Sequence, residues 1–463
     1  MSNAKGLANL TMSNPPRHFS EQPTAHPQQH VFGGLSSVRV NRELANWVAQ
    51  LIGLFLCMAP LFLVSLRGWA NAILIFGAFA CVVFLALNPQ GYSWGTWKRK
   101  PILILAVATL LAPVFAVAIS SGLRQSLYLP LFDSPARFCL AVPVLLFAIS
   151  SKFDASKFLQ FAIPAGLLAT LAQQNVVVQP MHWGATRMAT YFADPLVFGY
   201  VSMTFGLISA ISINLRAKDE PLVMAFKLVG ALAGLYLSIQ SGSRTGWAAV
   251  PIVLAVWAYQ HRGGKKQLQV AGAVAMTSVM SAVIYFTSST VHQRIGLSIN
   301  EVAAYPWVGV APDNAVGSRI TFLRMAWDLF FQSPWSGFGD TRFGQFAVPQ
   351  TINGYASDQA IHTAFNSGFH NEIVTNAIRS GIFGMVSSVG LFAVPFAVFV
   401  GKLKSGHRPT KANAVIGITF VICMFVSSLS TEILDMKYMA SFYALMIAML
   451  CGSTLAPHDH RQD

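Results

Sequence analysis

Long apolar runs alternate with short polar segments along most of the chain, from about residue 47 to residue 455. A helix of about 20 apolar residues spans the hydrocarbon core of a bilayer, because its backbone hydrogen bonds are all made within the helix. Twelve runs fit this pattern: about 47–66, 69–87, 101–121, 137–150, 157–175, 195–214, 221–240, 245–260, 268–287, 372–401, 412–430 and 437–455. The pattern predicts an all-α polytopic membrane protein with about twelve transmembrane helices.

The composition agrees with this prediction. Hydrophobic residues make up 54% of the 463 residues and charged residues 10%, whereas a soluble domain carries about 25% charged residues. The net charge is +14, from 31 Lys and Arg against 17 Asp and Glu. No nucleic-acid-binding pattern accompanies this excess, so nucleic acid is not an expected partner. The five cysteines lie in or beside apolar runs without CxxC spacing, as packing residues do.

Basic residues in the short loops predict the orientation, because such residues gather on the cytoplasmic side. With a cytoplasmic N-terminus, the loops on that side hold the basic clusters at 98–100, 152–157, 216–218, 262–266 and 402–411. The predicted organisation is a disordered cytoplasmic tail at 1–43, nine transmembrane helices at 44–287, one long external loop domain at 288–371, three transmembrane helices at 372–455 and a cytoplasmic tail at 456–463.

Three isolated arginines on the outer side depart from this charge pattern. Arg137 in FDSPARFCLAVP, Arg187 in HWGATRMATYFADP and Arg244 in SGSRTGW each lie at the mouth of a predicted helix. An arginine within a membrane helix costs about 3 kcal/mol. Each has an ordinary explanation: Arg137 could pair with Asp133, Arg187 could be a charge of an external loop, and Arg244 could reach lipid phosphates. Together they favour a site for a lipid diphosphate, since guanidinium groups suit phosphate.

The segment FHNEIVTNAIRSGIFGMV places His370, Asn371 and Glu372 at the mouth of another membrane helix. Histidine is the side chain most easily poised as a general base near neutral pH. Asn371 as the helix cap and Glu372 in the first turn are explained by helix initiation alone. Helix initiation does not explain His370, and we take His370 as the candidate base.

The loop domain and the segment STEILDMK supply further candidates on the same side. Within 317–339 the pattern predicts a capped amphipathic helix that lies on the membrane surface or covers the site. The supporting candidates are Arg319 on that helix and Glu432 and Lys437 of STEILDMK. Glu432 is a second candidate for the base, and Lys437 is a candidate for the phosphate cluster.

Several kinds of chemistry have no motif in the chain. HExxH, Walker A, GxSxG and GxGxxG patterns are absent from the sequence. No metal site and no cofactor are therefore predicted. The free energy for a reaction would come from an activated donor with a diphosphate leaving group.

Taken together, SGSRTGW, RITFLRMAWDLFFQSPWSGFG and FHNEIVTNAIRSGIFG, in this order and spacing, resemble the bacterial O-antigen ligase and O-antigen polymerase superfamily. FDSPARFCLAVP and TRMATYFADPLVFG resemble the ligase branch. The resemblance covers roughly residues 133–443.

This resemblance implies a metal-independent, inverting glycosyltransferase of the GT-C type in the bacterial inner membrane, with cytoplasmic termini and a periplasmic active site. The donor would be a glycan on undecaprenyl diphosphate, and the acceptor a sugar of the lipid A–core or another glycan. His370 would be the catalytic base, and Arg244, Arg187 and Arg137 would bind the diphosphate.

Other functions remain open from the sequence. A polymerase or a protein-directed oligosaccharyltransferase of the same superfamily would differ only in its acceptor. A transporter or flippase of polysaccharide lipids, a different class, would show charges near the middle of the membrane and broken helices in two related halves.

Overall fold

The computed structural model describes residues 42–88, 101–176, 187–260, 289–340 and 350–457, with the isolated positions 272, 275 and 286. The chain divides into Met1–Val40 and Asn41–Asp463, and all described residues belong to the second unit. The described residues form helices and connections without a β-strand, as the sequence predicts.

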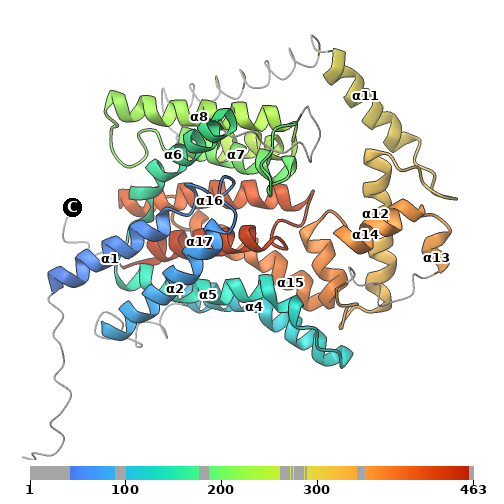
Figure 1. Cartoon of the computed structure of the whole chain (residues 1–463), viewed down its shortest axis with the longest axis horizontal. Coiled ribbons are helices and arrows are strands. Elements are labelled where there is room, and N and C mark those ends of the chain that lie inside the picture. Colours follow the sequence, from blue (N-terminus) through green and yellow to red (C-terminus); the bar gives the residue numbers. More distant parts are fainter. Residues whose placement is uncertain are drawn as a thin grey trace, which may run out of the picture. The chain divides into compact units, whose positions relative to one another are not determined.

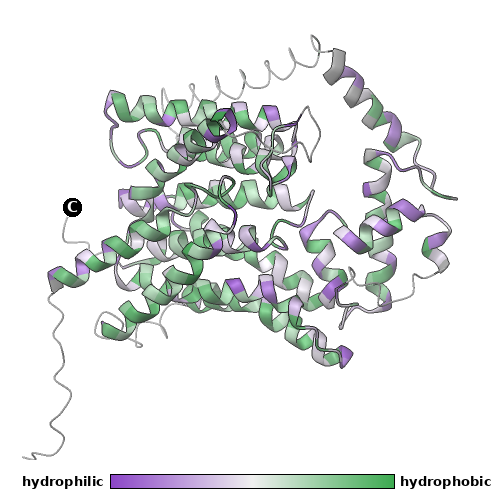
Figure 2. Cartoon of the chain, viewed as in Figure 1, coloured by the Kyte–Doolittle hydropathy of each residue, from purple (hydrophilic) through white to green (hydrophobic). Residues whose placement is uncertain are grey.

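Eight helices in the described ranges are long and apolar enough to cross a membrane. They are α2 (Trp69–Leu87), α4 (Pro101–Arg124), α5 (Asp133–Ser150) with the preceding 3₁₀ turn η2 (Leu129–Phe132), α6 (Ala155–Val176), α8 (Pro221–Ser241), α15 (Glu372–Val400), α16 (Arg408–Ser428) and α17 (Lys437–Leu455). Each coincides with a predicted run, so the all-α polytopic prediction is supported (Figures 1 and 2).

Three other predicted spans form shorter apolar helices, namely α1 (Arg42–Cys57), α7 (Pro195–Ile211), and the 3₁₀ turn η3 (Thr245–Ala249) with α9 (Val250–Gln260). Prolines account for two of the interruptions, because proline lacks an N–H and clashes with the preceding turn. Pro60 lies in the turns after α1, and Pro251 follows η3. The run at 268–287 lies outside the described residues, so the count of twelve stays a prediction.

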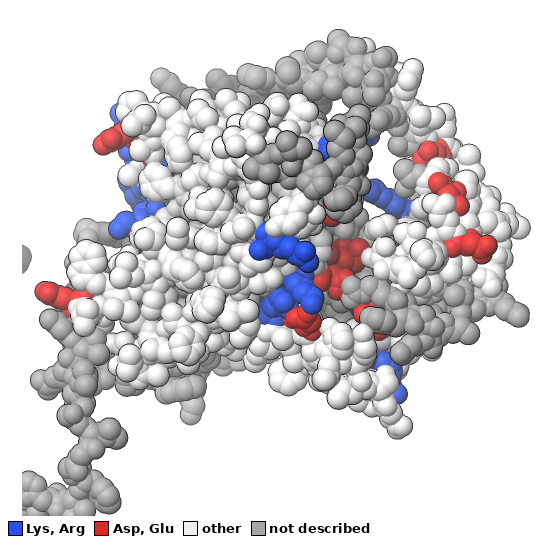
Figure 3. Space-filling model, in the orientation of Figure 1, with Lys and Arg blue, Asp and Glu red and all other residues white. Residues whose placement is uncertain are grey.

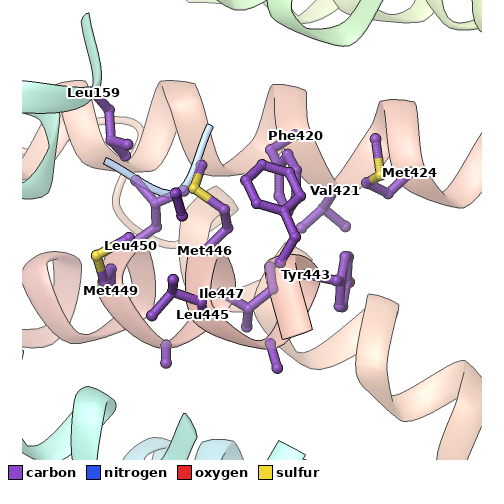
Figure 4. Packing of buried hydrophobic residues seen from close by; sticks show 14 of the residues in the cluster. Leu159, Phe420, Val421, Met424, Tyr443, Leu445, Met446, Ile447, Met449 and Leu450 are labelled. Carbon is purple, nitrogen blue, oxygen red and sulfur yellow. The ribbon is translucent and has the colours of Figure 1, made fainter. Parts of the chain in front are cut away.

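Helices α16 and α17 form the centre of the helical packing. Their most apolar windows are 83% and 89% buried, whereas those of α4 and α8 are 33% buried. Phe420 of α16 stacks on Tyr443 of α17 with ring centroids 5.6 Å apart, and Figure 4 shows the surrounding methionines and aliphatic side chains. The Tyr443 hydroxyl donates to the Leu391 carbonyl of α15 at 2.8 Å, which satisfies a polar group inside the apolar core.

Contacts between helix termini assign the termini of the described helices to two opposite ends. We call the "loop end" the one where α2, α5, α7, α15 and α17 begin and where α4, α8 and α16 finish. There Ser134 donates to the Asp435 carbonyl, and Arg187 donates to the Ser241 carbonyl. At the opposite end, Asp154 pairs with Arg216 and accepts from Asn413. This alternation of ends is what successive membrane crossings require.

The long loop predicted at 288–371 contains helices α11 (Ser289–Ala303), α12 (Ala315–Gln332), α13 (Gln350–Asn353) and α14 (Asp358–Ser367). Figure 1 shows α12 and α14 beside the first turns of α15. A helix is present where the capped amphipathic helix was predicted within 317–339. Helix α12 begins at Ala315, before that range, and its cap is Asn314, whose side chain accepts from the Gly317 N–H. Its buried side carries Phe322, Met325 and Leu329, while Leu323 and Trp327 are exposed.

Helix α15 is broken at Ser380 and Gly381, where the backbone leaves helical geometry. The segment after α12 bonds to the backbone groups around this break. Phe338 N–H donates to the Ile378 carbonyl at 2.8 Å, and Ile382 N–H donates to the Pro334 carbonyl at 2.7 Å. The break therefore fastens the loop helices to a membrane helix.

Candidate active site

His370 lies at the loop end, directly before α15, and its backbone has the left-handed φ of 52°. This conformation costs about 1–3 kcal/mol for a residue other than glycine and is concentrated at functional sites. The side chain is 37% exposed, and its ring packs edge-on against Phe322 of α12, with centroids 5.4 Å apart. The imidazole therefore has one side fixed by the loop helices and another open to solvent.

The Glu432 carboxylate lies behind His370. Its Oε2 is 3.9 Å from His370 Nδ1, and the side chain is 7% exposed. Its Oε1 accepts from the Thr375 hydroxyl at 2.7 Å and from the Asn371 N–H at 3.2 Å. Gly368 makes this approach possible, since a Cβ there would lie 2.5 Å from Glu432 Oε1. We call His370, Asn371, Thr375 and Glu432 the histidine group.

The sequence-predicted cap is confirmed at the same place. The Asn371 side chain accepts from the N–H groups of Ile373 and Val374. Glu372 is buried; its carboxylate accepts from the Leu434 N–H at 2.8 Å and from the Asn376 amide at 2.7 Å. Both residues thus hold the start of α15 and the 431–436 segment together, and His370 is left free for another role.

Arg187, in the connection before α7, contacts the end of α8, and Arg244 lies in the turn that follows α8. Arg187 Nε donates to the Ser241 carbonyl at 2.9 Å, and Gly242 takes a left-handed φ of 66° beside it. Arg244 follows two residues later with an exposed side chain, which has no hydrogen bond or ion pair to any other described residue. We call these two residues the arginine pair; they place two guanidinium groups at the loop end.

Arg137 belongs to a different group. It forms an ion pair with Asp133, four residues earlier on α5, and Asp133 also pairs with Lys437 at the start of α17. Arg137 Nε also lies 3.5 Å from the Asn71 side-chain oxygen of α2. The ion pair foreseen as the ordinary explanation of Arg137 is therefore present, and no hydrogen bond or ion pair within the described ranges joins Arg137 to the arginine pair.

An open cavity of about 810 Å³ lies between α4, α5 and α15. Its polar part includes Glu372, Asn376, Arg379 and Asp435, whereas Pro113, Val117 and Leu391 are among its apolar residues. His370, Arg137, Arg187 and Arg244 do not line it. Figure 3 shows basic and acidic side chains side by side on a face that is otherwise mostly uncharged.

Arg379 is a charged residue that the sequence reasoning missed. It is 7% exposed and binds Asp435 through both terminal nitrogens, at 2.9 and 3.3 Å. Its Nε lies 3.9 Å from Asp340 Oδ1 in the segment after α12. A cation inside the predicted run 372–401 was the available signal, because ionisable residues within membrane helices are rare and specifically paired.

Arg319 is exposed on α12 and makes no hydrogen bond or ion pair with other described residues. Among those residues, no group of three or more His, Cys, Asp and Glu side chains is placed to hold a metal ion. What the loop end does offer chemically is a partly exposed imidazole backed by a carboxylate, together with several guanidinium groups.

Comparisons with known proteins show which proteins the chain is similar to. Residues 229–389 match the family model described as O-antigen ligase. The matched segment contains the Arg244 turn, α12 and His370, and it ends before Glu432. A protein of Haemophilus influenzae described as uncharacterized is 21% identical over 401 residues, which is 83% of this chain and 93% of that relative. Over the segment that supplies His370 and Arg244, the chain is therefore similar to the family described as O-antigen ligase.

Proposed function

We propose that the chain is an O-antigen ligase, a glycosyltransferase that moves a glycan from undecaprenyl diphosphate to a sugar of the lipid A–core. The observation that carries the proposal is the histidine group. A partly exposed imidazole, 3.9 Å from a buried carboxylate, lies within the segment that matches the family. The eight membrane-length helices support the proposal, because the loop end would then lie at the depth where lipid-linked substrates present their headgroups.

In the proposed reaction, His370 accepts the proton of the acceptor hydroxyl as its oxygen attacks the anomeric carbon. Nδ1 faces Glu432, which leaves Nε2 for the acceptor. Glu432 holds the ring and favours the imidazolium that forms. Catalytic hydrogen bonds commonly shorten when substrate binds, so the 3.9 Å separation is compatible with this role. A base of this kind contributes about 10²–10⁴-fold to the rate.

The bond from the anomeric carbon to the diphosphate breaks as the new glycosidic bond forms, with inversion at that carbon. The diphosphate leaves with added negative charge. Arg187 and Arg244 are the proposed ligands of that charge, because fixed guanidinium groups stabilise charge that develops in the transition state. Arg137, Arg319 and Lys437 are proposed as supporting residues. The reaction needs no nucleotide and, in this proposal, no metal.

The proposal places the protein in the bacterial inner membrane with cytoplasmic termini and the loop end in the periplasm. This orientation puts the histidine group and the arginine pair on the side where lipid-linked glycans are joined. Cysteine-accessibility labelling of Ser357→Cys, in the connection before α14, and Ser405→Cys, between α15 and α16, tests it in intact cells. Labelling of Ser405→Cys from outside the inner membrane, with Ser357→Cys protected, would reverse the orientation.

Transfer by the purified protein in lipid nanodiscs tests the function. The substrates are carrier-linked glycan and lipid A–core, in buffer with EDTA and without nucleotide. We expect wild type to modify the lipid A–core and His370→Ala to lose about 10²-fold or more of kcat. His362→Ala is the matched control, since His362 is an exposed histidine of α14, and it is expected to keep its activity.

Each alternative has its own result in this assay. Lengthening of the carrier-linked glycan would make the protein a polymerase. Movement of intact carrier-linked glycan between leaflets, without transfer, would make it a flippase. Normal transfer by His370→Ala would remove the histidine from the mechanism.

A further inference from the structure

A second open pocket, of about 990 Å³, lies at the loop end between the first residues of α2 and α17. Arg67, Asn71, Tyr191, Phe192, Lys437 and Tyr438 are the lining residues used below. We call it the α2–α17 pocket. It shares only Lys437 with the 810 Å³ cavity and contains neither His370 nor the arginine pair.

The charge in the α2–α17 pocket is positive. Arg67 is exposed and has no hydrogen-bond or ion-pair partner among the described residues. Lys437 is 64% exposed and shares the single Asp133 carboxylate with Arg137, so that carboxylate neutralises only one of the two cations. No Asp or Glu among the described residues lines the pocket. An anionic group would therefore meet Arg67 and also Lys437, whose carboxylate partner Asp133 is shared with Arg137.

The backbone adds to this positive field. The first N–H groups of a helix have no partner within the helix and carry partial positive charge. Neither α2 nor α17 has a side-chain cap, whereas α7, α12, α14 and α15 are capped by Asp194, Asn314, Ser357 and Asn371. Helices α5 and α8 also lack a side-chain cap, but α2 and α17 are the ones that begin at the pocket that also holds Arg67 and Lys437.

The remaining wall of the pocket is aromatic. Tyr191 is 45% exposed and lies edge-on to Phe192, with ring centroids 5.0 Å apart, and Phe192 is edge-on to Tyr438 at 5.4 Å. Exposed aromatic faces offer packing to the C–H side of a sugar ring, while cations hold its charged substituents. The pocket thus combines the two kinds of contact that a phosphorylated sugar uses.

We propose that the α2–α17 pocket binds a phosphate group on the sugar headgroup of the acceptor lipid. Because α2 and α17 are membrane-length helices, their first residues lie at the depth of lipid headgroups. The inference rests on the proposed function for the identity of the acceptor. The ordinary alternative is that Arg67 is an interfacial arginine that touches bulk lipid phosphate. The proposal instead gives Arg67 a role in binding the acceptor.

The test measures binding and transfer separately. The protein is placed in phosphatidylcholine nanodiscs with fluorescently labelled lipid A–core, either phosphorylated or enzymatically dephosphorylated. Arg67→Gln is expected to weaken binding of the phosphorylated lipid about tenfold and to raise its KM equally, with kcat and the donor KM unchanged. Lys437→Gln is expected to weaken acceptor binding in the same direction, but its kcat and donor KM carry no such expectation, because Lys437 is also a proposed supporting residue for the diphosphate. Lys218→Gln, an exposed lysine at the opposite end, is the matched control and is expected to bind like wild type.

Dephosphorylation of the acceptor is expected to remove the difference between wild type and Arg67→Gln. Inorganic phosphate is expected to compete only at millimolar concentration, because it lacks the sugar. Equal weakening with both acceptors, no weakening with either, or a change in donor KM alone would overturn the proposal. So would competition by inorganic phosphate as strong as that by the lipid. If wild type binds phosphorylated acceptor through Arg67 but transfers nothing, the proposed function fails and the pocket stands.

Discussion

Replacing Arg379 tests whether the membrane helices and the loop helices are held together as described. Its guanidinium lies between Asp435, at 2.9 Å, and Asp340, at 3.9 Å. Asp435 precedes α17 and Asp340 follows α12, while Arg379 itself adjoins the break in α15. Three segments that are distant in sequence therefore depend on one side chain. Arg379→Met keeps the approximate length of the side chain and removes its charge and donors.

The expected cost follows from burial. Arg379 is 8% exposed at its side chain, Asp340 is 3% exposed and Asp435 is 20% exposed. Removing one partner from a buried ion pair costs about 3–5 kcal/mol, because the remaining charge loses its compensation. Arg379→Lys keeps the charge but cannot reproduce the two-pronged contact with Asp435, so we expect a loss of about 1–3 kcal/mol.

Thermal unfolding in detergent, followed by intrinsic tryptophan fluorescence, measures the effect. Arg379→Met is expected to unfold at a markedly lower temperature than wild type, with Arg379→Lys between them. The double variant Arg379→Met/Asp435→Asn is expected to be less destabilised than the sum of its single variants. Such non-additivity is the signature of a direct pair.

Two results would refute this reasoning. An Arg379→Met protein that unfolds at the wild-type temperature would show that the buried pair contributes no stability. Additive effects of Arg379→Met and Asp435→Asn would show that the two side chains do not interact in the folded protein. In either case the attachment of α12 would depend on the backbone hydrogen bonds at the α15 break alone.

The remaining predictions concern single sites. Glu432→Gln is expected to lower kcat for transfer about 10²–10⁴-fold without changing donor KM, and an unchanged kcat would exclude the carboxylate from the mechanism. Gly337→Ala is expected to lower the free energy of unfolding by about 1–3 kcal/mol, because φ is 60° and the added Cβ would lie 2.5 Å from a backbone oxygen. Gly390→Ala, at a helical position where the nearest atom to an added Cβ is 4.0 Å away, is the control and should be neutral. Lys227→Met should cost about 3–5 kcal/mol, since Lys227 is fully buried against Asp219, and Lys227→Met/Asp219→Asn should recover part of that loss.

Local features of the chain were predictable because their causes lie within a few residues. Continuous apolar sequence predicts α15 over 372–401, and the helix spans Glu372–Val400. An asparagine side chain reaches N–H groups two or three residues ahead, so the cap Asn371 follows from position alone. The polytopic, all-helical architecture has the same origin, since length and hydropathy decide whether a segment can satisfy its backbone in a membrane.

Positions of site residues relative to one another were not predictable in this way. Arg137, Arg187 and Arg244 look alike in the sequence, yet Arg187 binds the Ser241 carbonyl, three residues before Arg244, whereas Arg137 pairs with Asp133. The break in α15 was not predicted, because no proline lies at that position. Its unusual backbone conformation depends on hydrogen bonds from the segment after α12.

The sequence by itself determined the eight membrane-length helices and the cap at Asn371, because short-range hydrogen bonds and hydrophobic burial act within each segment. Only the tertiary structure decided which carboxylate backs the histidine. Glu432 reaches His370 because the connection before α17 packs along the first turns of α15. Such a contact depends on how whole helices pack, which no single segment encodes.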